Sequence, residues 1–206
     1  MRLLEGRTSM KRAAIGFRMH SGWGALVVMA NDGALEVAER RHIVIAEARI
    51  PGSKQPYHYV ENLGVKDAEK HLAHCSAASE QLTSAAVREL IEELDEREYR
   101  VSGAAMLMAS GGKVPSLAEI LASHALIHAA EGEFFRGIVR KACENIGIVV
   151  TPMRERELEE LAKDVLGKRA NQMKRRIWGF GRQLGPPWTQ DEKFAALAAT
   201  LILGPL

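Results

Sequence analysis

The opening of the chain contains three apolar runs separated by short turn signals. Residues 13–30, AAIGFRMHSGWGALVVMA, hold two runs on either side of residues 20–22, and this pattern predicts a β-hairpin. A second turn signal at residues 31–33, Asn-Asp-Gly, leads into a third strand-like segment over residues 35–45. Consecutive strands joined by tight turns pair antiparallel, so we expect a three-stranded meander at the start of the fold.

Helical and strand patterns alternate through the rest of the chain. In order, we expect a long helix over residues 65–98, a strand over 101–108, a helix over 116–147, a strand over 148–153, a short helix over 154–167 and a last, alanine-rich helix. The long helix has a candidate break near Ser84, and Gly111-Gly112 end the strand before the second helix. Thr189 and Glu192 have capping-box spacing at the start of the last helix. This order predicts an α/β mixed sheet, with three antiparallel strands and then parallel strands, flanked by helices.

Composition indicates how many domains the chain forms and in which cellular compartment we expect it. With 206 residues and 47% hydrophobic content, the chain can bury one sizeable core, so we expect a single domain over residues 13–206 after a flexible lead-in over residues 1–12. Cys75 and Cys143 have no metal or redox spacing, which favours the cytoplasm. No window approaches about 18 consecutive apolar residues, and the N-terminus lacks a secretory core, so no membrane partner is expected.

The helix over residues 116–147 carries three ionisable side chains in the middle of its apolar stripe. His124, His128 and Glu131 have i, i+4 and i+7 spacing and therefore share one helix face, within reach of a single divalent metal ion. The alternative is that both histidines are hydrogen-bonded core residues and that Glu131 pairs with Arg136 or Arg18. The stripe itself consists of Leu117, Leu121, Phe135, Val139, Ala142 and Ile146.

Two further segments hold candidate functional residues. Residues 51–64 form a long loop without hydrophobic period, in which Lys54, Tyr57 and His58 are the chemical candidates unless the loop is only a solvated crossover. Residues 163–182 hold seven Lys or Arg against one Asp, the only strong basic cluster in a chain of net charge +2. Its candidate nucleic-acid-binding residues, with a solvated helix face as the alternative, are Lys168, Arg169, Lys174, Arg175 and Arg176.

Three stretches resemble the ribonuclease H-like superfamily, and in particular its Holliday-junction resolvase branch. IGFRMHSGWGALVV is similar to that branch's first strand and turn, where an Ile-Gly-Ile-Asp strand leads to a Thr-Gly-aromatic second strand. EFFRGIVRKACENIGIVVTPMRERELEELAKDVLG is similar to its central helix, following strand and Pro-Arg-Glu-Val helix. LGPPWTQDEKFAALAATLIL resembles its closing segment, in which Asp residues start an alanine-rich helix. Together these stretches span roughly residues 13–203.

The resemblance implies a centre in which three or four carboxylates hold two divalent metals across a scissile phosphate. The family's first-strand Asp falls on Arg18 here, and the Glu that ends its fourth strand falls near residues 106–108, which are Met-Leu-Met. Of the closing Asp pair, one matches Asp191 and the other falls on Phe194. The resemblance therefore implies a nuclease-type fold with most of its catalytic carboxylates replaced.

Three hypotheses follow. The first is a catalytically altered ribonuclease H-like protein that binds DNA or RNA through residues 163–182. The second is a hydrolase for a phosphate ester or small substrate, in which His20, His124, His128, Glu131 and Asp191 form one rebuilt centre and Arg18 neutralises developing negative charge. The third is a non-catalytic scaffold that binds a protein or a second copy of itself. In the second hypothesis these side chains meet in one cleft, and a divalent metal is the candidate cofactor.

Overall fold

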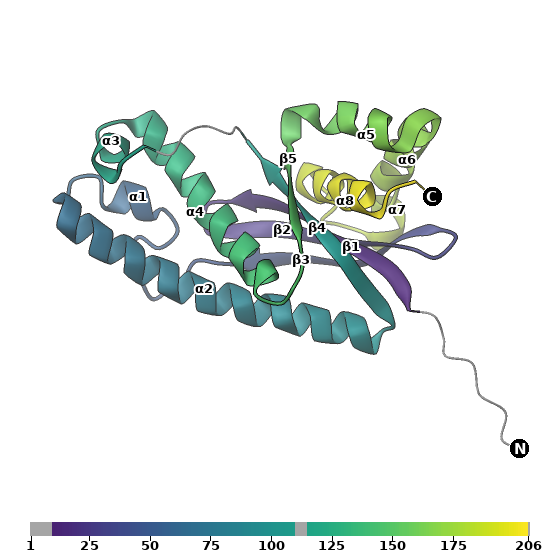
Figure 1. The fold of residues 1–206 in the computed structure, drawn as a ribbon, viewed down its shortest axis with the longest axis horizontal. Coiled ribbons are helices and arrows are strands. Elements are labelled where there is room, and N and C mark those ends of the chain that lie inside the picture. The colour runs from purple at the N-terminus through teal and green to yellow at the C-terminus, as the bar shows by residue number, and fades with distance from the viewer. Residues whose placement is uncertain (1–9, 110–114, 206) are drawn as a thin grey trace, which may run out of the picture.

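A mixed five-stranded sheet forms the centre of the computed structural model, which describes residues 10–109 and 115–205 (Figure 1). The strands are β1 (Lys11–His20), β2 (Trp23–Asn31), β3 (Leu35–Val44), β4 (Tyr99–Met108) and β5 (Val150–Arg154), and their order across the sheet is β3-β2-β1-β4-β5. Pairing is antiparallel for β1 with β2 and β2 with β3, and parallel for β1 with β4 and β4 with β5. The predicted fold class is therefore confirmed.

The predicted hairpin forms at the expected residues. His20 pairs with Trp23 across a tight turn, and Gly22 in this turn has φ of 80°, a backbone conformation that glycine adopts without a steric penalty. β1 begins at Lys11, inside the segment predicted as a lead-in. Residues 1–9 of that lead-in and the predicted strand end at Gly111-Gly112 lie outside the described residues.

Two long helices cover one face of the sheet. α2 (Val65–Glu96) is continuous, without a break at Ser84, and α4 (His124–Glu144) packs beside it. The core between these helices and the strands includes Phe17 and Phe135, both fully buried. Ala13, Ile15 and Phe17 of β1 belong to this core, whereas Ala14 belongs to the core on the opposite face, as expected for a strand in a central layer.

The last helix, α8 (Gln190–Leu203), packs on the opposite face of the sheet, against β1, β2 and β4. α8 is alanine-rich because it crosses β1 closely: a Cβ atom on Gly16 would lie 1.9 Å from the Ala195 carbonyl oxygen. α5 (Leu158–Leu166) and α6 (Ala170–Gly179) pack against the outer side of α8 (Figure 1). They follow the short 3-10 helices η1 (Glu155–Glu157) and η2 (Gly167–Arg169), and α7 (Gly181–Leu184) leads on toward α8.

Two predicted elements differ from the structure. The helix expected over residues 116–147 is two helices, because α3 (Leu117–Leu121) ends before Ser123 and α4 starts afresh at His124. A capping box at Ser116 and Glu119 stabilises the short α3 separately. The expected loop over residues 51–64 contains a one-turn helix, α1 (Pro56–Tyr59), with Pro56 in its favoured first-turn position. Across the described part of the chain, no helix has the length and apolar character needed to cross a bilayer.

Candidate functional site

Arg18 lies between two carboxylates at the end of β1. Its Nε and Nη2 atoms donate to the two carboxylate oxygens of Glu155, at 2.9 and 2.8 Å, and its Nη1 atom donates to Asp191. His20 Nε2 lies 3.1 Å from the Asp191 carboxylate. We call Arg18, His20, Glu155 and Asp191 the arginine cluster. The hydrogen bonds to Glu155 and Asp191 raise the pKa of the Arg18 guanidinium, although burial opposes them.

Three elements of the fold bring Arg18, Glu155 and Asp191 together. Arg18 lies near the C-terminal end of β1, and Glu155 follows directly after β5, the strand on the far side of β4. Asp191 is in the first turn of α8, where Thr189 Oγ1 accepts a hydrogen bond from its backbone N–H at 3.2 Å. Carboxyl ends of parallel strands and a helix N-terminus thus meet at one edge of the sheet, the usual place for a site in such folds.

A row of imidazole and indole rings extends from the arginine cluster to β3, the outermost strand of the sheet. His20 stacks on Trp23, with ring centroids 4.4 Å apart, and Trp23 contacts His42 on β3, at 4.8 Å. His42 Nε2 lies 2.9 Å from the carboxylate of Glu192, which is 2% exposed and also closes the predicted capping box at Thr189. Burial raises the pKa of Glu192, but hydrogen bonds from Thr189 and His42 outweigh it and lower this pKa to about 2.

A second polar group forms where α1 meets the first turns of α4. His58, His124 and His128 place their candidate ligand atoms within 4.8 Å of one another. Glu131 is buried, and its Oε1 lies 2.9 Å from His58 Nδ1 and accepts from the His58 backbone N–H at 3.2 Å. We call His58, His124, His128 and Glu131 the histidine cluster.

The histidine cluster differs from the predicted arrangement in three ways. His124 and His128 are exposed, although the apolar stripe predicted burial, because α4 starts at His124 and its first turns extend past the core. Glu131 pairs with neither Arg136 nor Arg18: Arg136 pairs with Glu133 at 2.8 Å. The third imidazole comes from His58, a loop candidate that the sequence did not connect with α4.

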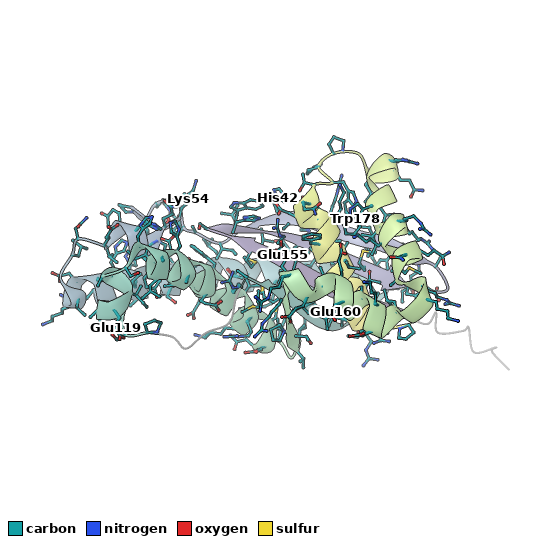
Figure 2. All side chains as sticks on the ribbon, turned by 90° about the horizontal axis from the view of Figure 1, so that it is seen from above. His42, Lys54, Glu119, Glu155, Glu160 and Trp178 are labelled. Atoms are coloured by element: carbon teal, nitrogen blue, oxygen red, sulfur yellow. The ribbon has the colours of Figure 1, made fainter. Side chains whose placement is uncertain are left out.

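The six predicted catalytic residues therefore fall into two groups. Arg18, His20 and Asp191 belong to the arginine cluster, whereas His124, His128 and Glu131 belong to the histidine cluster. In Figure 2, Lys54 and Glu119 mark the end of the molecule that carries α1 and α3, while His42 and Glu155 lie nearer the middle. The contacts therefore do not bring all six side chains into a single centre.

Sequence reasoning missed Glu155 as a member of the arginine cluster, and it missed the pair of His42 and Glu192 beside that cluster. Glu155 follows a predicted strand, and a carboxylate at the C-terminal end of a parallel strand was the available signal. His42 offered none, because its contact with Glu192 spans 150 residues. Of the loop candidates, Lys54 is exposed, and Tyr57 packs edge-on to Phe134 with ring centroids 6.1 Å apart. Burial, and secondarily the Glu131 charge, raises the pKa of Tyr57.

The basic segment over residues 163–182 forms η2, α6, α7 and the end of α5. Lys168, Arg169 and Arg175 are exposed. Lys174 pairs with Glu159 and lies 5.3 Å over the Trp178 ring, and Arg176 donates to the Leu35 carbonyl at 2.8 Å. Part of the predicted binding face is thus engaged within the fold, and part is open to solvent.

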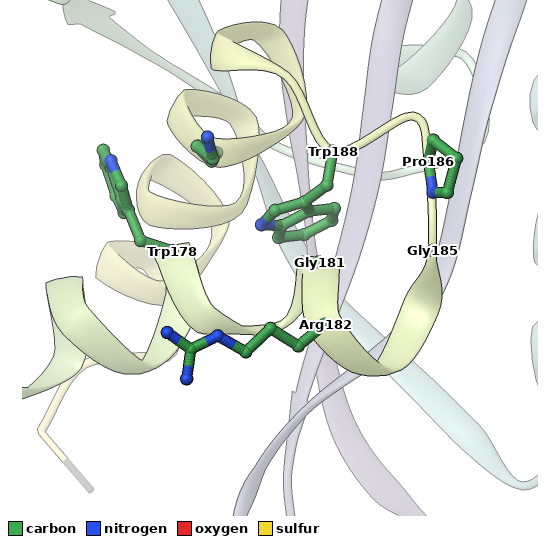
Figure 3. A pocket seen from close by; sticks show the side chains of 7 residues that line it. Trp178, Gly181, Arg182, Gly185, Pro186 and Trp188 are labelled. Carbon is green, nitrogen blue, oxygen red and sulfur yellow. The ribbon is translucent and has the colours of Figure 1, made fainter.

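A shallow hollow of about 340 Å³ lies beside this segment, between α6 and the start of α8 (Figure 3). Trp178, Trp188, Arg182 and Lys193 line it, together with Gly181, Gly185 and Pro186. Trp188 is held by a 2.9 Å hydrogen bond from its Nε1 to the Ile177 carbonyl. Arg40 of β3 anchors the rim by donating to the carbonyls of Leu184 and Gly185, at 2.7 and 2.9 Å. The hollow combines aromatic faces with positive charge.

The sheet order and the helices on both faces define a ribonuclease H-like, resolvase-type fold. Among solved structures, the chain is similar to Thermus thermophilus RuvC in complex with a Holliday junction substrate, with a TM-score of 0.52 and 12% identity over 92% of this chain and 91% of that one. The Thermus thermophilus RuvC structure also matches, with a TM-score of 0.49 and 13% identity over the same shares. No family model and no curated protein sequence matches the chain.

Proposed function

We propose that this protein is a catalytically altered, resolvase-like member of the ribonuclease H-like fold that associates with nucleic acid. The observation that carries the proposal is the position of Arg18. Its guanidinium pairs with Glu155 and Asp191 at the strand position where the resolvase resemblance expects a metal-binding Asp. A guanidinium is permanently charged, so it pairs with both carboxylates, offsets one of their two negative charges, and repels a divalent cation beside them.

The neighbouring strand supports the same conclusion. β4 contains no Asp or Glu, and Met106 and Met108 are near the position where the resemblance expects a Glu. Two-metal phosphodiester hydrolysis needs several carboxylates on one cleft, because they hold both ions across the phosphate. With Arg18 and the β4 methionines in these places, we expect no cleavage by that mechanism.

Association with nucleic acid rests on residues 163–182 and the adjoining hollow. Exposed Lys and Arg contact phosphates without sequence preference, and exposed aromatic faces stack on bases. Lys168 and Arg175 supply exposed charge, and Trp178 and Arg182 supply a ring and a guanidinium beside it. Because the similar RuvC structure is bound to a Holliday junction, we take branched DNA as the first ligand to test.

The test measures affinity for a four-way DNA junction as salt rises. We expect binding at low ionic strength that weakens linearly in log K against log salt, and no cleavage when Mg²⁺ or Mn²⁺ is added. Arg175→Ala should weaken binding and reduce the salt slope by about one. Lys66→Ala, which removes an exposed lysine on α2, is the matched control and should leave both unchanged. Absence of binding at low salt, or metal-dependent cleavage, would contradict the proposal.

The same proposal takes the protein as cytoplasmic and residues 13–206 as one domain, to which Lys11 and Arg12 are added because they belong to β1. Cys75 and Cys143 are free and buried, which suits a reducing compartment. A second copy of the chain is the other candidate partner, and light scattering over a range of concentrations would detect a homodimer.

A further inference from the structure

Three imidazole rings from two separate segments converge on one point at the surface. The centroids of His124 and His128 are 4.5 Å apart, and the His58 centroid lies 4.6 Å from His128 and 5.2 Å from His124. Each pair of rings meets edge to face, with interplanar angles between 65 and 81°. One ring nitrogen of each histidine also lies within 4.8 Å of those of the other two, so the three rings place nitrogen atoms around a shared space.

The nitrogen spacing suits a tetrahedral metal ion. His124 Nε2 and His128 Nε2 are 3.0 Å apart. Two nitrogens bound to one tetrahedral zinc ion, each about 2.0–2.1 Å from the metal, lie about 3.3 Å apart. A candidate ligand atom of His58 lies within 4.8 Å of those of the other two. Small side-chain rotations of the two exposed histidines would close this distance.

The position of Glu131 is independent evidence for a metal-binding site. Its side chain is 2% exposed and lies 2.9 Å from His58 Nδ1, which leaves His58 Nε2 as the nitrogen available to a ligand. Metal-binding histidines generally donate their second ring N–H to a carboxylate or carbonyl, which fixes the tautomer and the ring orientation. A buried carboxylate is costly unless it is paired, and Glu131 Oε1 is held close to both the His58 ring nitrogen and the His58 backbone N–H, from which it accepts a hydrogen bond at 3.2 Å.

We propose that His58, His124 and His128 bind one zinc-class divalent transition metal ion, with Glu131 as the residue that orients His58. Imidazole ligands favour zinc, copper, nickel or cobalt over magnesium and calcium, which prefer oxygen. Three protein ligands leave a fourth position, open to solvent at the exposed His124 and His128, for water or an anion. The ion would join α1 to α4, in addition to the contacts of Tyr57 with Phe134 and of His58 with Glu131.

The test is titration of the full-length, chelator-treated protein with Zn²⁺ and Co²⁺. We expect one ion per chain, a rise in the thermal unfolding temperature with Zn²⁺, and the strong visible absorption of tetrahedral Co²⁺. His128→Ala and His124→Ala, each at an exposed position, should abolish the one-to-one binding and the Co²⁺ spectrum. Glu131→Gln should weaken Zn²⁺ affinity about 10- to 100-fold.

His74→Ala is the matched control, because His74 is an exposed histidine on α2 outside the cluster. It should bind Zn²⁺ and Co²⁺ like the unaltered protein. The proposal is overturned if the unaltered protein binds no ion, or if His124→Ala and His128→Ala bind as tightly as His74→Ala. Because the readouts are stoichiometry, spectrum and stability, they are independent of whether the protein binds nucleic acid.

Discussion

The Arg18 guanidinium forms a two-point contact with the Glu155 carboxylate, 2.9 Å from Nε to Oε2 and 2.8 Å from Nη2 to Oε1. Its third nitrogen donates to Asp191, so one cation joins the end of β1, the residue after β5 and the first turn of α8. An arginine fork matches a carboxylate in this geometry better than a lysine can. Arg18 therefore holds three elements of the fold together.

Removal of Arg18 should destabilise the protein. Arg18→Ala leaves the half-buried Glu155 and Asp191 carboxylates without their cation, and we expect a loss of about 2 kcal/mol in the free energy of unfolding, measured by urea denaturation. Arg154→Ala breaks a surface pair with Glu157, whose side chains are 48% and 40% exposed, and should cost about 0.5 kcal/mol at most. Equal losses in the two variants would show that the arginine cluster contributes no more than a surface ion pair.

Glu192 should make stability depend on pH in the acid range. Its pKa is about 2 in the folded protein against 4.5 ordinarily, so the folded state favours the ionised form. This contribution is complete well above pH 4.5 and is lost as the pH falls toward 2, with a total of about 3 kcal/mol. Glu192→Gln should therefore be less stable than the unaltered protein at pH 7, with the difference shrinking below pH about 4.5.

Urea unfolding at a series of pH values measures this difference. Thr189→Ala removes one of the hydrogen-bond donors to Glu192 and should reproduce part of the same pH dependence. If the free energies of unfolding of Glu192→Gln and the unaltered protein differ by a constant amount from pH 7 to pH 3, the Glu192 carboxylate does not cause the pH dependence of stability.

Gly16→Ala should be strongly destabilising. The new methyl group would meet the Ala195 carbonyl oxygen at 1.9 Å, so β1 and α8 would have to separate, at a cost of about 3 kcal/mol. Gly137→Ala is the opposite case: its methyl group would meet nothing within 4 Å, and alanine favours the helix, so stability should rise by about 0.5–1 kcal/mol. Thermal unfolding of both variants tests this contrast, and similar shifts would argue against the close packing of α8 on β1.

Trp178→Ala should weaken DNA binding without loss of the fold, if the proposed association is correct. Trp178 is only half-buried and lies beside Lys174, and loss of one stacked base is expected to reduce affinity about tenfold at constant salt. Fluorescence anisotropy with a labelled junction measures the change. Tyr59→Ala removes a 50% exposed ring on α1 and should leave affinity unchanged. Equal DNA affinities of the unaltered protein, Trp178→Ala and Tyr59→Ala would show that Trp178 is not part of the binding surface.

Local sequence patterns predicted most of the elements correctly. The hairpin at His20 and Trp23, the long helical segment of α2 and the capping box at Thr189 and Glu192 each depend on residues close together in the chain, although the candidate break near Ser84 does not occur. The break before His124 was missed, because the apolar spacing continues through Ser123 while the backbone does not. Periodicity records which residues face one side, and it does not record whether the helix under them is continuous.

The sequence by itself determined the strand and helix order and the fold class, and it indicated candidate functional residues. Tertiary structure alone decided which of those residues meet. His58 and Glu131 are 73 positions apart and Arg18 and Asp191 are 173 apart, so their contacts arise from the packing of α1 on α4 and of α8 on β1. Propensity and period act over a few residues, whereas the partner of a charged side chain is selected by burial and geometry across the whole fold.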